Sequence, residues 1–137
     1  MTQEDKELLL KDLCARLPYR VKVLVDDNGI ETIEIFEGFH VVDDYIDNVT
    51  CFRSYTICDI DEIKPYLFPL SSMTEEQREE FNSFFTSVPY YGNNDHEHVV
   101  PYYFVELLIE FFHKNHIDNN GLIEKGLALD ATGLNIY

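Results

Sequence analysis

The sequence predicts a single α+β domain with an N-terminal helix, a three- to four-stranded antiparallel meander, and then two to three helices. Three patterns support this fold class: a helix-capping signal at the start, alternating valines before an Asn-Gly turn, and a second capping signal in the second half. The chain has 137 residues, and no linker or internal repeat divides it. We therefore expect one acidic domain spanning 1–137.

The N-terminal segment has the features of a helix that covers a sheet. Thr2 and Asp5 resemble a capping box, and acidic residues in the first turn suit the positive end of the helix dipole. Pro18 ends the pattern. The apolar stripe that we expect to face the core consists of Leu9, Leu10, Leu13, Cys14 and Leu17.

Residues 20–58 combine strand-forming side chains with turn signals. Asn28-Gly29 is a strong hairpin signal, Glu37-Gly38 is expected to end the return strand, and Asp47-Asn48 is expected to form the next turn. The alternation of apolar and polar residues indicates an antiparallel sheet that is half-buried on one face. The predicted strands are 20–25, 30–36, 39–46 and 49–58.

The second half is predicted to be mainly helical. Thr74 and Gln77 form a capping box, and Pro101 suits the first turn of a helix that runs to about His116. The first of these helices has an apolar stripe of Phe81, Phe84, Phe85 and Val88. Shorter features are a helical turn at 60–64 before Pro65, a long polar loop at 89–100, and a turn at 122–125 ended by Gly126.

The helix that follows Pro101 contains the E-x-x-H element of di-iron bundles, Glu110 to His113. A di-iron site needs a second such element on another helix and two further carboxylates from other helices, and no other predicted helix carries a second element. A helical wheel places Phe104, Leu107, Leu108 and Phe111 toward the core, and Glu106, Glu110 and His113 toward solvent.

The charge balance limits the classes of function. Ten basic residues stand against 26 acidic ones, and the net charge of −16 is divided evenly between the two halves. Direct binding to nucleic acid needs a basic surface and is therefore not expected. No apolar run is long enough for a membrane span, and the polar N-terminal residues do not resemble a secretory signal. Cys14, Cys51 and Cys58 are expected to be reduced, in a soluble intracellular protein.

Catalytic signals are missing from the sequence. It has no G-x-S-x-G element, no phosphate-binding glycine loop and no cysteine beside a histidine. We therefore expect a protein that is not an enzyme and that has no cofactor.

The long loop and the start of the next helix hold two candidate sites. His96 and His98, with a carboxylate from elsewhere, would bind a divalent metal ion, and a solvated polar loop is the alternative. Clustered tyrosines favour a partner-binding surface, and packing under the loop is the alternative. These tyrosines are Tyr90, Tyr91, Tyr102 and Tyr103.

Part of the acidic excess lies in helix first turns, where it has a local structural reason, but the carboxylates around the meander do not. If they form one surface, they could imitate DNA phosphates and occupy the basic groove of a nucleic-acid enzyme. Solubility is the alternative reason for such residues. The residues are Asp26, Asp27, Asp43, Asp44, Asp47, Asp59 and Asp61.

Three stretches, 1–19, 63–77 and 121–131, resemble an uncharacterised family of small proteins from phages and mobile elements of gut anaerobic bacteria. They cover about a third of the chain. Asp118-Asn119-Asn120 departs from the Asp-Tyr-Arg expected before the last stretch, which removes a possible cationic contact at Asn120. The resemblance implies a setting in the cytoplasm of a bacterial host, and it implies no activity or catalytic residue.

These observations together predict an accessory protein that binds a host or phage protein and performs no catalysis. The first alternative is an anti-defence inhibitor that mimics DNA. The second is a metal-binding protein or enzyme that uses the loop with His96 and His98.

Overall fold

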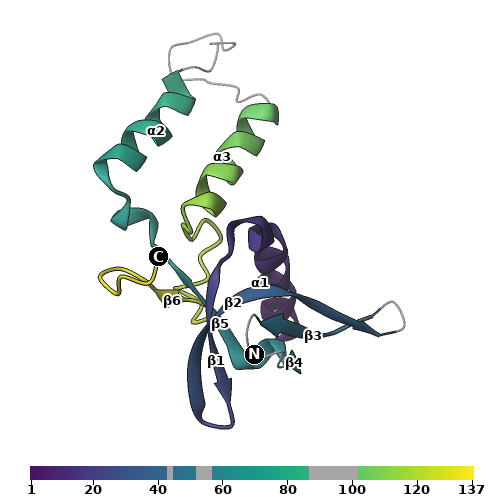
Figure 1. Ribbon diagram of the computed structural model, residues 1–137. Coiled ribbons are helices and arrows are strands. Elements are labelled where there is room, and N and C mark those ends of the chain that lie inside the picture. Colours follow the sequence, from purple (N-terminus) through teal and green to yellow (C-terminus); the bar gives the residue numbers. More distant parts are fainter. Residues whose placement is uncertain (43–44, 52–56, 87–101) are drawn as a thin grey trace.

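The computed structural model confirms the α+β class (Figure 1). The structure describes residues 1–42, 45–51, 57–86 and 102–137, and it describes side chains at 1–39, 59–85 and 104–137. Within those ranges no helix is both long and apolar enough to cross a membrane. The helices are α1 (Gln3–Arg16), α2 (Glu75–Thr86) and α3 (Tyr102–Lys114), and the short 3-10 turns are η1 (Leu17–Tyr19), η2 (Ile60–Glu62) and η3 (Leu70–Ser72). The strands are β1 (Lys22–Asp27), β2 (Ile30–Val42), β3 (Tyr45–Cys51), β4 (Ile57–Cys58), β5 (Ile63–Leu67) and β6 (Leu129–Asp130).

Both predicted capping boxes are present. The Asp5 amide donates to Thr2 Oγ1 at 3.1 Å and the Thr2 amide donates to Asp5 Oδ2 at 3.2 Å, so α1 begins where the sequence indicates. At α2 the Gln77 amide donates to Thr74 Oγ1 at 3.1 Å, and the Thr74 amide donates to Gln77 Oε1 at 3.0 Å. Each box satisfies amides that the first turn of a helix leaves without partners.

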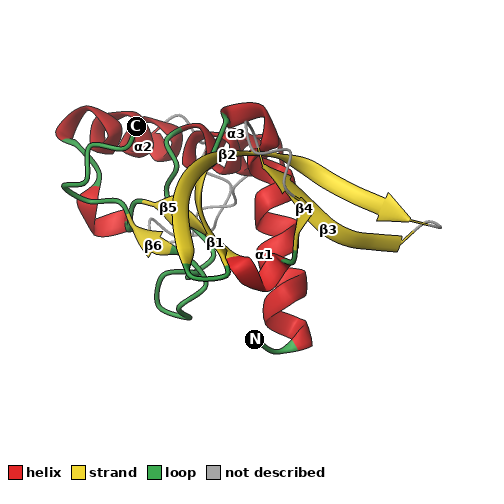
Figure 2. Ribbon diagram, turned by 60° about the horizontal axis from the view of Figure 1, so that its bottom comes forward, coloured by secondary structure: helices red, strands yellow, loops and turns green. Residues whose placement is uncertain are grey.

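The sheet has the strand order β4-β3-β2-β1-β5-β6. The meander from β1 to β4 is antiparallel as predicted, and β5 also pairs antiparallel with β1. In contrast β5 and β6 are parallel, so the sheet as a whole is mixed. The strands β2 and β3 form a long arm that extends away from the rest of the sheet (Figure 2).

Two predicted turns in the meander are wrong. Glu37-Gly38 lies inside β2, where the pairing with β3 shifts register between Phe36 and Gly38. Such a bulge takes in an extra residue without ending the strand. Asp47-Asn48 lies inside β3, and the reversal between β2 and β3 comes earlier, between Val42 and Tyr45.

The sequence also failed to predict β5, because Pro65 lies in the middle of it. A proline lacks the amide that a ladder requires and normally indicates an edge strand. Pro65 stands opposite Val23 of β1, and the pairing of β5 with β6 begins one residue later, at Tyr66. At Pro65 no residue of β6 is paired with β5, so the amide that proline lacks is not needed for the pairing of these two strands.

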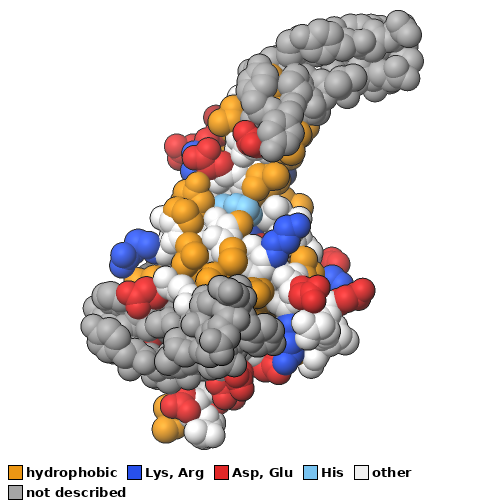
Figure 3. All heavy atoms as spheres, turned by 90° about the vertical axis from the view of Figure 1, so that its right-hand side faces the viewer, with side chains coloured by type: hydrophobic (Ala, Val, Ile, Leu, Met, Phe, Trp, Pro, Cys, Tyr) orange, Lys and Arg blue, Asp and Glu red, His pale blue; other side chains and the backbone are white. Residues whose placement is uncertain are grey.

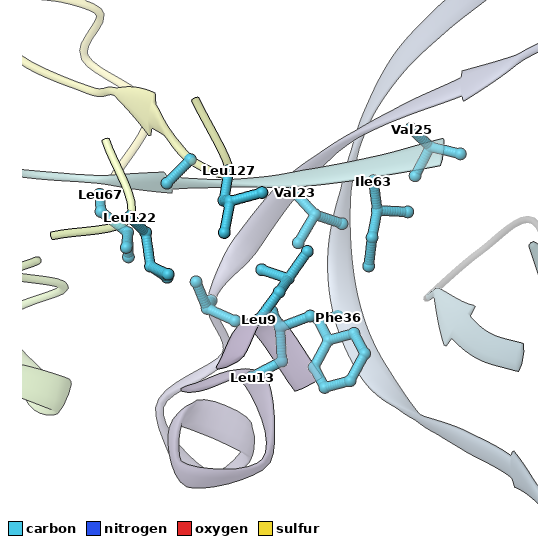
Figure 4. Packing of buried hydrophobic residues seen from close by; sticks show 11 residues of the cluster. Leu9, Leu13, Val23, Val25, Phe36, Ile63, Leu67, Leu122 and Leu127 are labelled. Carbon is cyan, nitrogen blue, oxygen red and sulfur yellow. The ribbon is translucent and has the colours of Figure 1, made fainter. Parts of the chain in front are cut away.

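The main core lies between α1 and the sheet (Figure 4). Leu9 and Leu13 of α1 are fully buried, and they point toward side chains of β1, β2 and β5. Cys14, which the wheel assigned to this stripe, is exposed instead, because its position follows Leu13 and turns past the edge of the contact with the sheet. The other core members are Val21, Val23, Val25, Phe36, Ile63, Leu67, Leu122, Leu127 and Ala128.

The helices α2 and α3 stand side by side as a hairpin that extends away from the sheet (Figure 1). Phenylalanine rings fill the space between them: Phe81 lies 6.3 Å from Phe111 and 6.0 Å from Phe112, and Phe84 lies 5.8 Å from Phe111. At the base, Lys114 Nζ is 3.1 Å from Glu80 Oε1. Ring packing therefore holds the hairpin together.

The helical wheel of α3 was wrong at two positions. His113, which we expected in solvent, is only 7% exposed, and Leu107, which we expected in the core, is 43% exposed. The last turn of α3 packs against α1 as well as α2, so two partners approach it from different directions. A wheel assumes a single buried side and cannot show the second partner.

A tyrosine hydroxyl connects β1 and β5 where their direct pairing stops. The Lys22 amide donates to Tyr137 Oη at 2.9 Å, and Tyr137 Oη donates to the Tyr66 carbonyl at 2.7 Å. The register of β1 and β5 would place Lys22 opposite Tyr66 as the next pair after Val23 and Pro65. The hydroxyl thus replaces a direct hydrogen bond between the two strands.

We expect Tyr137→Phe to lower the free energy of unfolding by about 1–2 kcal/mol, because it leaves one donor and one acceptor of the backbone without a partner. Chemical denaturation of the full chain measures the change. Tyr19→Phe is the control, because within the described ranges the Tyr19 hydroxyl makes no bridge between strands like that of Tyr137, and it should change stability by less than about 0.5 kcal/mol. Equal losses in the two variants would contradict the bridging role.

Candidate functional site

A buried polar cluster lies where the end of α1 meets the end of α3. Asp12 and Arg16, one helical turn apart on α1, form its centre, and both side chains are fully buried. Arg16 Nε is 2.6 Å from Asp12 Oδ2, and Arg16 Nη2 is 3.1 Å from Asp12 Oδ1. The two-point contact neutralises both charges inside the protein.

The same guanidinium holds the chain that follows α3. Arg16 Nη2 also donates to the Ile117 carbonyl at 2.8 Å and to Asn119 Oδ1 at 3.1 Å. Asn120 Nδ2 in turn donates to Asp12 Oδ1 at 2.8 Å. Asn120 therefore contacts the same carboxylate oxygen as Arg16 Nη2.

Asp118 organises the turn beyond this point. Its carboxylate accepts hydrogen bonds from the amides of Leu122 and Ile123, both at 2.9 Å. The predicted turn at 122–125 is present, and Gly126 ends it with a φ of +72°, a value that glycine adopts without strain. Leu122 is thereby fixed in the core beneath α1.

Two histidines near the end of α3 complete the cluster. Burial lowers the pKa of His113, and the positive charge of Arg16 lowers it further. The pKa of His116 falls from 6.5 to about 4, first through burial and then through the charges of Arg16 and Lys22. The His116 ring stacks on Tyr137 with 3.7 Å between ring centres. Both imidazoles are therefore neutral at pH 7.

The chemistry that this cluster supports is structural. Asp12 is already bound to Arg16 and Asn120, so its carboxylate is committed to these two partners. Within the described ranges no group of three His, Cys, Asp or Glu side chains is placed to hold a metal ion. We assign the cluster the role of a joint that fixes the base of the α2–α3 hairpin to α1.

Most of the residues that the sequence singled out lie outside the described residues or have only a described backbone. Tyr90, Tyr91, His96 and His98 lie outside them, as do Asp43 and Asp44. Tyr102 and Tyr103 lie in the first turn of α3, and Asp47 lies in β3.

Comparison with protein-family models, with curated proteins and with solved structures found no match.

Four of the predicted acidic residues lie at one end of the sheet. Asp26 and Asp27 lead into the β1–β2 turn, and Asp59 and Asp61 lie at η2, which contacts β1 and precedes β5. The strand register adds Glu31, which stands directly opposite Asp26. Asp61 is paired with Lys6 Nζ at 3.0 Å, and Asp26 Oδ1 accepts the Gly29 amide of the turn at 2.8 Å. Asp26 and Glu31 are nevertheless both exposed and form a like-charge pair.

The second surface feature is the hairpin face, which we define as Phe81, Phe85, Val105, Ile109 and Phe112. Phe85 is 46% exposed, Val105 is 38% exposed and Ile109 is 41% exposed. Phe85 contacts Phe81 with 5.1 Å between ring centres, and Phe81 contacts Phe112. Val105, Ile109 and Phe112 follow the i, i+4, i+7 spacing of one helical stripe. The five side chains therefore join α2 and α3 in one apolar surface.

We expect Asp12→Leu and Arg16→Met each to destabilise the protein by about 3–5 kcal/mol, because each leaves one charge of the pair buried without its counter-ion. The double variant Asp12→Leu/Arg16→Met removes both charges and should lose less than the two single changes combined. Chemical denaturation of the two single variants and the double variant gives the interaction energy, expected at about 2–3 kcal/mol. Additive losses would show that the pair does not act as a unit.

Stability should fall as the pH drops from 6.5 to about 4, because the unfolded His116 takes up a proton more readily than the folded one. Thermal unfolding between pH 7 and pH 4 measures this loss. His116→Asn is the matched variant, because asparagine tolerates the left-handed φ of +56° at this position. The variant should be less stable at pH 7 but should lose less stability on acidification. An unchanged pH slope would contradict the assignment.

Proposed function

We propose that this chain is a protein-binding module of a phage or mobile element, and that it acts on a host or phage protein in the bacterial cytoplasm by binding rather than by catalysis. The setting is supported by the resemblance of 1–19, 63–77 and 121–131 to a family from such elements. The mode of action is supported by the hairpin face.

The exposure of the hairpin face is the observation on which this proposal rests. Phe85, Val105 and Ile109 each leave more than a third of their surface in water, although the rings of Phe84 and Phe111 on the same helices pack against each other. Scattered exposed apolar residues are normal, but a continuous apolar surface across two elements is typical of an interaction site. Helical faces with apolar residues at this spacing are a recurring mode of protein recognition.

Leu107 provides an internal comparison on the same helix. It is 43% exposed, which matches Ile109, but it lies roughly 160° away around the axis of α3. It therefore lies outside the hairpin face, on the side of α3 that carries Lys114, the residue paired with Glu80. Leu107 and Ile109 are aliphatic residues of similar exposure on opposite sides of the same helix. The same substitution at each position therefore tests whether binding depends on the hairpin face.

We expect the tagged full chain to capture a protein partner from host or infected-cell lysate, and Ile109→Ala to reduce the captured amount about tenfold. Leu107→Ala should capture as much as the wild type. Quantitative mass spectrometry of the three eluates, with circular dichroism to confirm equal folding, measures both effects. The protein-binding function is refuted if the wild type captures no protein above a tag-only control, and its location is refuted if the two variants behave alike.

DNA mimicry is the alternative form of this proposal, and the acidic end of the sheet supports it. The Gly29 amide accounts for a hydrogen-bond acceptor at Asp26, which an asparagine would also supply, but not for a negative charge opposite Glu31, so the like-charge pair favours a use for the charge. In this form the captured protein is a nucleic-acid enzyme. Its binding would weaken steeply with added salt and would be lost in Asp26→Asn/Asp27→Asn/Glu31→Gln rather than in Ile109→Ala.

A further inference from the structure

The shape of the hairpin face limits what can cover it. Figure 3 shows apolar side chains along the α2–α3 part of the molecule, with acidic side chains beside them. The stripe from Val105 to Phe112 runs along the α3 axis for about 10 Å, and Phe85 and Phe81 bring a second row from α2. A rod with a continuous apolar stripe contacts both rows at once, and an α-helix has that shape.

The backbone chemistry of the face also favours a helix as its occupant. The polar backbone groups of α2 and α3 are used within each helix, so the face offers side chains but no ladder of free amides and carbonyls. An extended segment that buried itself here would leave its own backbone groups without partners. A helix forms its backbone hydrogen bonds internally, so its burial here leaves no backbone group along the face without a partner.

The charge around the face indicates the polarity of the occupant. On α3, Glu106 lies about 60° around the helix axis from Ile109, at the border of the stripe. Glu110 lies one turn further along, between the stripe and the side of Leu107. The helix residues 75–86 and 102–114 contain six glutamates against Arg78 and Lys114, and Lys114 is already paired with Glu80. Because the whole chain carries −16, a second copy would bring the same excess of negative charge to the contact. A cationic occupant is therefore favoured over self-association.

We propose that the hairpin face binds a basic amphipathic helix of the partner protein, which adds a third helix to α2 and α3. Its apolar residues, spaced i, i+4 and i+7, contact Phe85, Val105 and Ile109, and lysines or arginines on its flank lie against Glu106 and Glu110. This inference rests on the protein-binding function and deepens it, because it names the secondary structure and the charge of the bound segment.

The test uses the full chain and three synthetic peptides of about 18 residues, a length at which a helix forms on binding. The first has an apolar stripe at helical spacing with lysine and arginine elsewhere. The second has the same composition in scrambled order, and the third replaces the basic residues with glutamate. Fluorescence anisotropy at about 0.15 M salt measures their affinities. We expect the first peptide to bind at least about tenfold more tightly than the other two.

Variants of the chain locate the binding. Ile109→Ala should weaken binding of the first peptide about tenfold, whereas Leu107→Ala should change it less than about twofold. Glu106→Gln/Glu110→Gln should weaken it a few-fold and reduce its dependence on salt. All these positions are exposed, so the variants keep the fold, and circular dichroism verifies this.

Three results would overturn the inference: equal binding of the three peptides, equal effects of the changes at Ile109 and Leu107, or a dimer in sedimentation that Ile109→Ala dissociates. Capture of a cellular protein that depends on Ile109, without discrimination among the peptides, would reject the basic helix and leave the protein-binding function intact. Failure of both capture and peptide binding would reject both proposals.

Discussion

The structure depends on one buried ion pair, between Asp12 and Arg16. A guanidinium fully removed from water is stable only if its charge and most of its donors are satisfied. Asp12 supplies the charge, and Ile117 and Asn119 accept further hydrogen bonds of Arg16. Because these acceptors lie more than a hundred residues away, the pair requires that α1 and the segment after α3 come together. Formation of this contact therefore fixes where the α2–α3 hairpin lies relative to α1.

This joint explains why the hairpin exposes an apolar face. The last turn of α3 is fixed between α1 and the chain at 116–118, which is hydrogen-bonded to Phe68 beside β5. Beyond that turn, toward its N-terminal end, the described part of α3 has α2 as its packing partner. One helix covers less than half of another, whereas the apolar residues of α3 extend over a wider arc, from Leu107 to Ile109. The uncovered part of that arc, together with Phe81 and Phe85 of α2, is the hairpin face.

Local signals predicted the local structure well. The capping boxes at Thr2 and Thr74, the Asn28-Gly29 turn and the turn before Gly126 all depend on contacts within a few residues, so the sequence shows them directly. The errors arose where a distant partner decides the outcome. Pro65 is tolerated because of where β6 begins, and Gly38 interrupts the register of β2 without ending the strand. Neither condition is visible in the neighbouring residues.

The candidate site was harder to predict for the same reason. Asp12 and Arg16 have the spacing of an ordinary exposed helix pair, and only residues 117–120 turn them into a buried centre. The E-x-x-H element did mark His113, but as a possible metal ligand rather than as a neutral histidine beside a buried arginine. The signal that could have revealed the site is the combination of an i, i+4 ion pair with a polar Asp-Asn-Asn run that follows a helix, since such a run needs partners wherever it is buried.

The hairpin face and the acidic excess are best considered together. Full burial of a side chain such as Ile109 or Val105 contributes about 1.5–3 kcal/mol, and this gain is only partly realised while the side chains remain exposed. Charged side chains are common in this chain, whose net charge is −16, and they would suit an exposed helix surface. Solubility therefore does not explain the apolar residues at 105 and 109. Long-range attraction from the negative charge and short-range burial at the face act on the same kind of partner. The charge speeds the approach of a cationic segment, and the apolar stripe then sets how long it stays bound.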